Sequence, residues 1–280
     1  MGLLFTLIAI GGVSIGATID KLNFSKNHIS FRQVMALVFL AMSVSLLLFI
    51  IVTKQPFPKF SLFSFGLIAL IALVSFAGNI FDYLSLKVDD LSLREPMLDF
   101  EPILAGLVGY FLFPAERRIG FLVAFILGAF VVYWGTHRRS LRKLQRKGMS
   151  YLLLSAVFYA LLPSIYKVAM VYIGPAYISF FRVTAILLLT MLFFPVRKLH
   201  RLSPGKVAYS FSAGIFYALA AVAGLYAIKA LGVVLTSLLM LLGPVLRYLA
   251  SYFILKEKVR SGEVFASFLL VAVILVSIFI

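Results

Sequence analysis

Three carboxylates lie close together in a part of the chain that is otherwise apolar enough to cross a membrane. Glu95, Asp99 and Glu101 fall near the start of the apolar stretch 91–113. Glu95 and Asp99 are four positions apart and would share one face of a helix, whereas Glu101 would point elsewhere. A carboxylate inside a bilayer is costly and is usually kept for a function such as proton exchange. We therefore take these three residues as candidates for reversible proton binding, with a headgroup position at the helix end as the alternative for Glu95.

A second group of polar residues, in other apolar stretches, has the chemistry to bind a small polar solute. Asn79 and Asp82 are three positions apart and would share a helical face. Arg247 could hold a carboxylate as a bidentate fork, or it could form a salt bridge that joins two parts of the fold. Tyrosines could add hydroxyls, although packing explains them equally well in a chain that is 15% aromatic. The candidate binding residues are Asn79, Asp82, Tyr83, Tyr159, Tyr217 and Arg247.

Two further basic residues lie near the ends of apolar stretches. Lys167 and Arg182 are expected to extend to the membrane surface, with their aliphatic stems along the helix. An alternative for the acids is a buried pair, in which Asp99 or Glu101 would contact Arg247 or Lys167. Each of these arrangements would remove an isolated charge from the apolar interior.

These polar residues are set in a chain that is 63% hydrophobic and 13% charged, with a mean hydropathy of +1.09. A soluble domain could not bury so much apolar surface, so the composition predicts an all-α polytopic membrane protein. Small residues four apart, such as Gly12 and Gly16, predict close helix packing. Proline, glycine and charged residues divide the chain into ten predicted transmembrane helices, over 2–18, 31–52, 62–86, 91–113, 119–134, 149–171, 176–194, 206–230, 233–255 and 264–280.

The chain contains an internal repeat at a constant offset of 142 positions, which aligns Lys87 with Lys229 and Pro102 with Pro244. Each half then holds five spans, and an odd number inserts the second half upside down relative to the first. Inverted repeats of this kind are typical of alternating-access carriers, although duplication can also build a channel or a static scaffold. Pro96, Pro102 and Pro244 are candidate hinges or kinks. The predicted domains are a first repeat over 1–137, a basic loop over 138–148 and a second repeat over 149–280.

Basic residues are unevenly divided between alternate loops. The loops after the first, third, fifth, seventh and ninth spans hold 18 Lys and Arg residues, and the other loops hold 4. The positive-inside rule therefore places the first set in the cytoplasm and both termini outside. The net charge of +16 is explained by these loops, so we expect no nucleic-acid partner.

The two halves resemble the drug/metabolite transporter superfamily and its EamA-like branch. Each half of that family has a helix with a central proline, then an acidic residue and a glycine that begins the last helix. The matching residues are Pro102, Glu116 and Gly120 in the first half and Pro244, Glu257 and Gly262 in the second. The chain departs from the family in its acid-rich stretch 91–113 and in Trp134, which lies outside the first helix of either half. The family habit places both termini in the cytoplasm, against the loop charges.

No motif supports an enzyme. The chain has no phosphate-binding loop and no cysteine, and its three histidines are scattered without metal-ligand spacing. We therefore expect no cofactor and no metal. The inverted repeat predicts a secondary transporter, and the resemblance implies a small polar metabolite, such as an amino acid, that is exported or exchanged. From the carboxylates of the stretch 91–113 we expect possible coupling to protons, and we expect the protein in the cell membrane as a monomer or homodimer. The alternatives are a carrier for a lipid-linked or nucleotide-linked sugar and, from another class, a non-transporting scaffold or receptor.

Overall fold

The part of the chain that the structure describes is mostly helical, with short non-helical connections. The computed structural model describes residues 1–25, 29–86, 100–137, 146–194, 202–243, 246 and 261–279. These residues form nine α-helices and one short 3-10 helix, with no β-strand among them. The elements are α1 (Gly2–Ser25), α2 (Phe31–Val52), α3 (Leu62–Leu86), α5 (Phe100–Leu112), η1 (Pro114–Glu116), α6 (Ile119–His137), α7 (Arg146–Ala169), α8 (Pro175–Phe193), α9 (Pro204–Met240) and α11 (Ser261–Phe279).

Six of these helices, α1, α2, α3, α7, α8 and α9, are long and apolar enough to cross a membrane, and α5, α6 and α11 contain shorter apolar stretches. Large apolar side chains also remain on the outer surface, where Phe65 is 65% exposed and Leu188 is 63% exposed. Such a surface is unfavourable in water and suits contact with lipid. The chain is therefore a multi-pass membrane protein.

Local signals set several helix ends where the sequence predicts them. The predicted spans 31–52 and 62–86 coincide with α2 and α3. At the start of α2, Ser30 and Gln33 form a capping box, in which each side chain accepts a hydrogen bond from the other's backbone N–H. Pro175 and Pro204 occupy the first turns of α8 and α9, where a missing N–H is tolerated. The predicted spans 91–113 and 233–255 lie partly outside the described residues.

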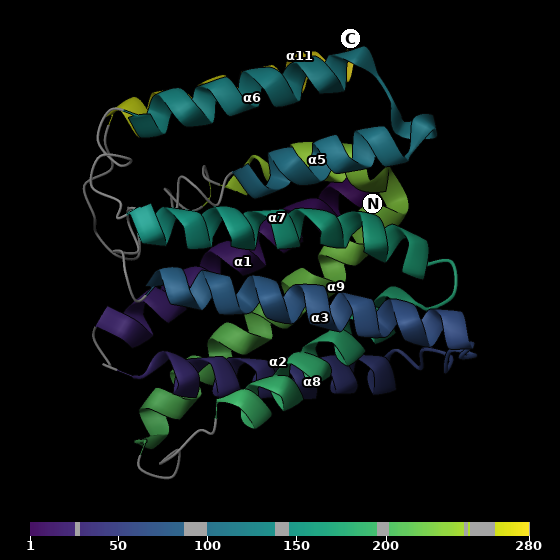
Figure 1. The fold of residues 1–280 in the computed structure, drawn as a ribbon, viewed down its shortest axis with the longest axis vertical. Helices are drawn as coiled ribbons and strands as arrows, with labels where there is room; N and C mark the ends of the chain where they lie inside the picture. The colour runs from purple at the N-terminus through teal and green to yellow at the C-terminus, as the bar shows by residue number, and fades with distance from the viewer. Residues whose placement is uncertain are drawn as a thin grey trace.

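The helices lie side by side in a stack (Figure 1). α6 packs against α11 at one end of the stack, and α2 packs against α8 at the opposite end. Between these pairs, α9 packs against α1, α2, α5, α7 and α8, while α3 packs against α7 and α8. Thus α9 has the most neighbours and can bring together side chains from several elements.

The helix α9 contains a break at Gly232, as the sequence predicts. The backbone of Gly232 has φ 83° and ψ 175°, whereas the residues on both sides are helical. Only glycine adopts this conformation readily. A Cβ atom at this position would also lie 2.3 Å from Oε1 of Glu116. The break therefore begins a new helical segment at Val233 and brings its first turn against η1.

Candidate functional site

Small residues on α1 bring this helix close to α9. A Cβ atom on Gly12 would lie 2.7 Å from the carbonyl oxygen of Phe216, and one on Gly16 would lie 2.8 Å from the ring of Tyr217. Both glycines thus allow an approach that any larger residue would prevent, as their spacing predicts. The ring of Tyr217 consequently lies against Gly16 and reaches the next turn of α1.

That next turn carries Asp20, which the sequence analysis missed. The Tyr217 hydroxyl donates a hydrogen bond of 3.1 Å to Oδ2 of Asp20. Oδ1 of Asp20 is buried and has no hydrogen-bond partner among the described residues. Asn23, one turn further along α1, and Asp82 on α3 lie close enough to interact with the Asp20 carboxyl. A carboxyl on α1 and a tyrosine on α9 are therefore bonded near one end of α1, with a second carboxyl on α3 within electrostatic reach.

The predicted binding residues on α3 lie next to this group. Asp82 is half-buried, and the half-buried Asn79 donates a hydrogen bond of 2.7 Å to the backbone oxygen of Ser75 in its own helix. Tyr159 of α7 lies against α3, because a Cβ atom on Gly78 would be 2.9 Å from its ring. Tyr83 is in α3, but its side chain lies outside the described part of the chain.

The remaining predicted residues lie either in the first turn of α5 or outside the described ranges. Glu101 and Pro102 are in the first turn of α5, and both are half-buried. The described helix begins at Phe100, so a kink at Pro102 remains a prediction. The predicted residues outside the described ranges are Glu95, Pro96, Asp99, Pro244 and Arg247.

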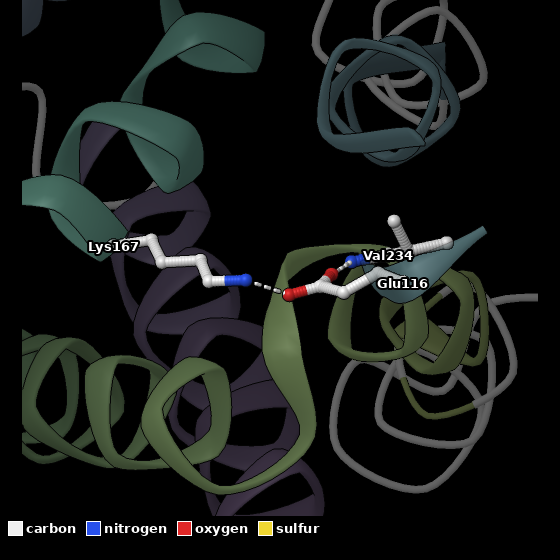
Figure 2. A network of polar contacts seen from close by, with 3 residues as sticks. All are labelled: Glu116, Lys167 and Val234. Atoms are coloured by element: carbon white, nitrogen blue, oxygen red, sulfur yellow. Dashed lines mark hydrogen bonds and ion pairs between the residues drawn. The ribbon is translucent and has the colours of Figure 1, made fainter. Parts of the chain in front are cut away.

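A second polar group joins η1, α7 and the break in α9 (Figure 2). The Glu116 carboxylate forms an ion pair through Oε1 with the Lys167 ammonium. Its Oε2 accepts a hydrogen bond of 2.8 Å from the backbone N–H of Val234. Val234 lies in the first turn after the break, where backbone N–H groups lack helical partners and favour a negative charge. Each oxygen of one carboxylate is thus bound by a different element.

The structure pairs Lys167 with Glu116, whereas the sequence predicts that its side chain extends to the membrane surface or pairs with Asp99 or Glu101. Its ammonium group also lies 4.0 Å from the ring centroid of Phe113, a cation–π contact. The side chain is 32% exposed and that of Glu116 is 14% exposed. Pairing with a carboxylate therefore takes the place of the exposure to headgroups that a lone lysine would need.

Arg182 likewise has a partner inside the protein, which the sequence does not predict. Its Nη1 donates a hydrogen bond of 2.5 Å to the hydroxyl of Tyr166, and its Nε atom is buried. Tyr166 precedes Lys167 on α7, so α7 and α8 are joined beside the Glu116 network. Arg182 is best described as an internal contact between these two helices.

The two polar groups lie at opposite ends of α1. The first residue of α1, Gly2, contacts Leu231 beside the break, since a Cβ atom on Gly2 would be 2.5 Å from Leu231. Asp20 lies about 27 Å further along α1 at 1.5 Å per residue. The Glu116 network is therefore on the face opposite the C-terminal end of α1. No group of three or more metal-ligand side chains occurs among the described residues.

Comparison with known proteins agrees with this architecture. A solved structure described only as "Crystal structure of protein" superimposes with a TM-score of 0.79, covering 99% of this chain and 96% of that chain at 16% identity. At that identity the likeness shows the fold alone. No curated protein matches the sequence. The model of the EamA-like transporter family matches residues 146–279.

This match confirms the family resemblance, and the members of the family are membrane transporters of the drug/metabolite type rather than enzymes. The matched range begins at the start of α7 and ends with α11, and it nearly coincides with the predicted second repeat, 149–280. The second half of the chain is thus similar to the EamA-like transporter family.

Proposed function

We propose that the protein is a secondary active transporter that exports or exchanges a small polar metabolite, such as an amino acid, across the cell membrane. In this proposal ten spans form two inverted five-helix repeats that alternate access to a polar site between them. The sequence has no phosphate-binding loop, so the energy would come from a gradient or from exchange. A proton carried by a membrane carboxylate is the proposed coupling ion.

The helix contacts support the proposed repeat. The repeat equates α1 with α7, α2 with α8, and α3 with the part of α9 before Gly232. Under this exchange the contact of α1 with α9 becomes that of α7 with α3, and both contacts occur. Likewise, the contact of α2 with α9 becomes that of α8 with α3, which also occurs. A pseudo-two-fold arrangement of two inverted halves accounts for these equivalences.

The observation that carries the proposal is the Asp20 carboxyl at the contact between the two predicted halves. It lies on α1 of the first half and is bonded by Tyr217 on α9 of the second. A carboxylate inside a spanning helix costs about 2.5–3.5 kcal/mol and is a functional candidate by default. A group at the interface of two moving halves is suited to changing its partners, and its protonation, as the halves move.

The chemistry of this group favours a substrate with a positively charged amine. Asp20 and Asp82 lie within electrostatic reach of each other, and a cation bound near both would relieve the repulsion between the two carboxylates. Arg247 remains the proposed ligand of a substrate carboxylate, so the substrate would be a zwitterion. Glu95, Asp99 and Glu101 remain candidate coupling residues, and Asp20 joins them.

Transport in proteoliposomes tests this proposal. We would measure uptake and counterflow of a radiolabelled amino-acid panel, with and without a pH gradient, for wild type, Asp20→Asn and Asp20→Glu. We expect gradient-driven uptake in wild type, its loss in Asp20→Asn with counterflow retained, and partial recovery in Asp20→Glu, which keeps a carboxylate. The absence of flux for every amino acid would contradict the substrate class. Gradient-driven uptake that persists in Asp20→Asn would contradict the role of Asp20.

A further inference from the structure

The Glu116 network joins the two predicted halves of the protein at one face. Glu116 belongs to the first half, whereas Lys167 and Val234 belong to the second. In Figure 2 the Glu116 carboxylate lies between the Lys167 ammonium on one side and the Val234 backbone on the other. Any movement that separates the halves at this face must therefore change the partners of one carboxylate.

The geometry makes this connection specific. Both bonds are charge-assisted, which makes them stronger than neutral hydrogen bonds. The carboxylate can reach Val234 only because residue 232 has no side chain, since a Cβ atom there would lie 2.3 Å from Oε1. The ring of Phe113 supports Lys167 from within the first half. Gly232 and Lys167 thus lie against the Glu116 carboxylate, and Phe113 lies against Lys167.

The same geometry allows the connection to be released. The side chains of Lys167 and Glu116 are partly exposed, so water can solvate both charges once they separate. The N–H of Val234 is in the first turn of a helical segment, where water can replace the carboxylate. Release therefore requires no unfolding of a helix.

We propose that Glu116, Lys167 and the Val234 N–H form a latch that holds the protein closed on the face that carries η1. Opening on this face requires the Glu116 carboxylate to leave both partners. The latch is formed in this structure, which is accordingly closed on the η1 face. This inference rests on the proposed alternating access, but its test needs no substrate, so a wrong substrate class leaves it intact.

Cysteine labelling tests the latch directly, because the chain has no cysteine of its own. Ser237, one turn beyond Val234 in α9, is 5% exposed, and the substitution Ser237→Cys makes it the reporter. Single cysteines at the exposed Ala115 on η1 and Ser203 before α9 establish which face a membrane-impermeant maleimide reaches in each vesicle preparation. The reporter is then combined with Glu116→Gln, Lys167→Met or both, and with Lys229→Met as the control for an exposed lysine outside the network.

We expect slow labelling of the reporter thiol in the otherwise unchanged protein. Glu116→Gln and Lys167→Met should each raise the rate from the η1 face by about 10- to 100-fold, the range that one charge-assisted hydrogen bond supplies. The double variant should match the single ones, because either change breaks the same ion pair, and Lys229→Met should leave the rate unchanged. Equal increases in labelling from both faces would show that the substitutions only loosen the packing between the halves, and would overturn the proposal. Unchanged labelling in Glu116→Gln, which keeps the size of the side chain, would overturn it as well.

Discussion

Replacing Gly232 by alanine would strain the latch at its backbone, and the structure gives two separate costs. The first is conformational, because a residue with a Cβ atom is unfavourable at φ 83° and ψ 175° by about 1–3 kcal/mol. The second is steric, because the new Cβ atom would lie 2.3 Å from Oε1 of Glu116. The carboxylate would have to move and give up its charge-assisted bonds, at about 1.5–3 kcal/mol. We therefore expect a total loss of about 2.5–6 kcal/mol.

Thermal unfolding in detergent measures this loss. For a chain of this size about 2 °C in Tm corresponds to 1 kcal/mol, so Gly232→Ala should lower Tm by roughly 5–12 °C. In a Glu116→Ala background the steric cost disappears, and the same change should lower Tm by only about 2–6 °C. Gly66→Ala is the matched control, because a Cβ atom on Gly66 meets nothing within 4 Å. It should leave Tm unchanged or raise it slightly, since alanine is favoured over glycine inside a helix.

Two results would refute this reasoning. If Gly232→Ala had the wild-type Tm and left labelling of the Ser237→Cys reporter slow, neither the backbone strain nor the close approach of Glu116 would be real. If its effect were as large in the Glu116→Ala background as in wild type, the whole cost would belong to the backbone. The steric link between residue 232 and the carboxylate would then be wrong.

Two further predictions concern helix contacts. Tyr217→Phe removes the hydrogen bond to Asp20 and should cost about 1–3 kcal/mol in thermal unfolding, together with reduced gradient-driven uptake. The control is Tyr226→Phe, which keeps the ring stacked on Phe5. Equal effects of the two changes would contradict the role of the Tyr217 hydroxyl. Gly106→Ala places a Cβ atom 2.0 Å from Cζ of the fully buried Phe125 and should cost about 1–3 kcal/mol, measured as a lower Tm. Adding Phe125→Leu should restore part of the Tm. If it restored none, the contact with Phe125 would not be the cause of the loss.

Much of the fold can be predicted from the sequence because lipid permits few arrangements of the backbone. A spanning segment must satisfy its own hydrogen bonds as a helix, so length and hydropathy identify it. The bounds of α2 and α3 follow from turn and capping residues at the ends of apolar runs, and the break at Gly232 follows from a glycine between two such runs. How the helices pack depends on tertiary contacts, which show only as small-residue pairs such as Gly12 and Gly16.

The candidate site could be predicted only in part, because its members are defined by neighbours distant in sequence. Asp82 and Tyr217 are candidates from the sequence, but the sequence places Asp20 just after a predicted helix, at the start of a basic loop. Its role depends on Tyr217, 197 positions away. The pairing of Lys167 with Glu116 could not be predicted for the same reason, since the two residues are 51 positions apart. An inverted repeat does offer a signal, because it places η1, the end of α7 and the Gly232 break on one face.

The break at Gly232 also explains how the two polar groups can act in sequence. Tyr217 and Val234 are both on α9, but they lie on opposite sides of the break. If α9 were one rigid helix, movement at the Glu116 end would be transmitted directly to the Tyr217–Asp20 hydrogen bond. With a non-helical residue between them, the segment after Gly232 can leave Glu116 while the segment before it keeps its packing on α1. In the proposed cycle, the latch can therefore open without disrupting the Asp20 group, and the polar site stays intact while access to it changes.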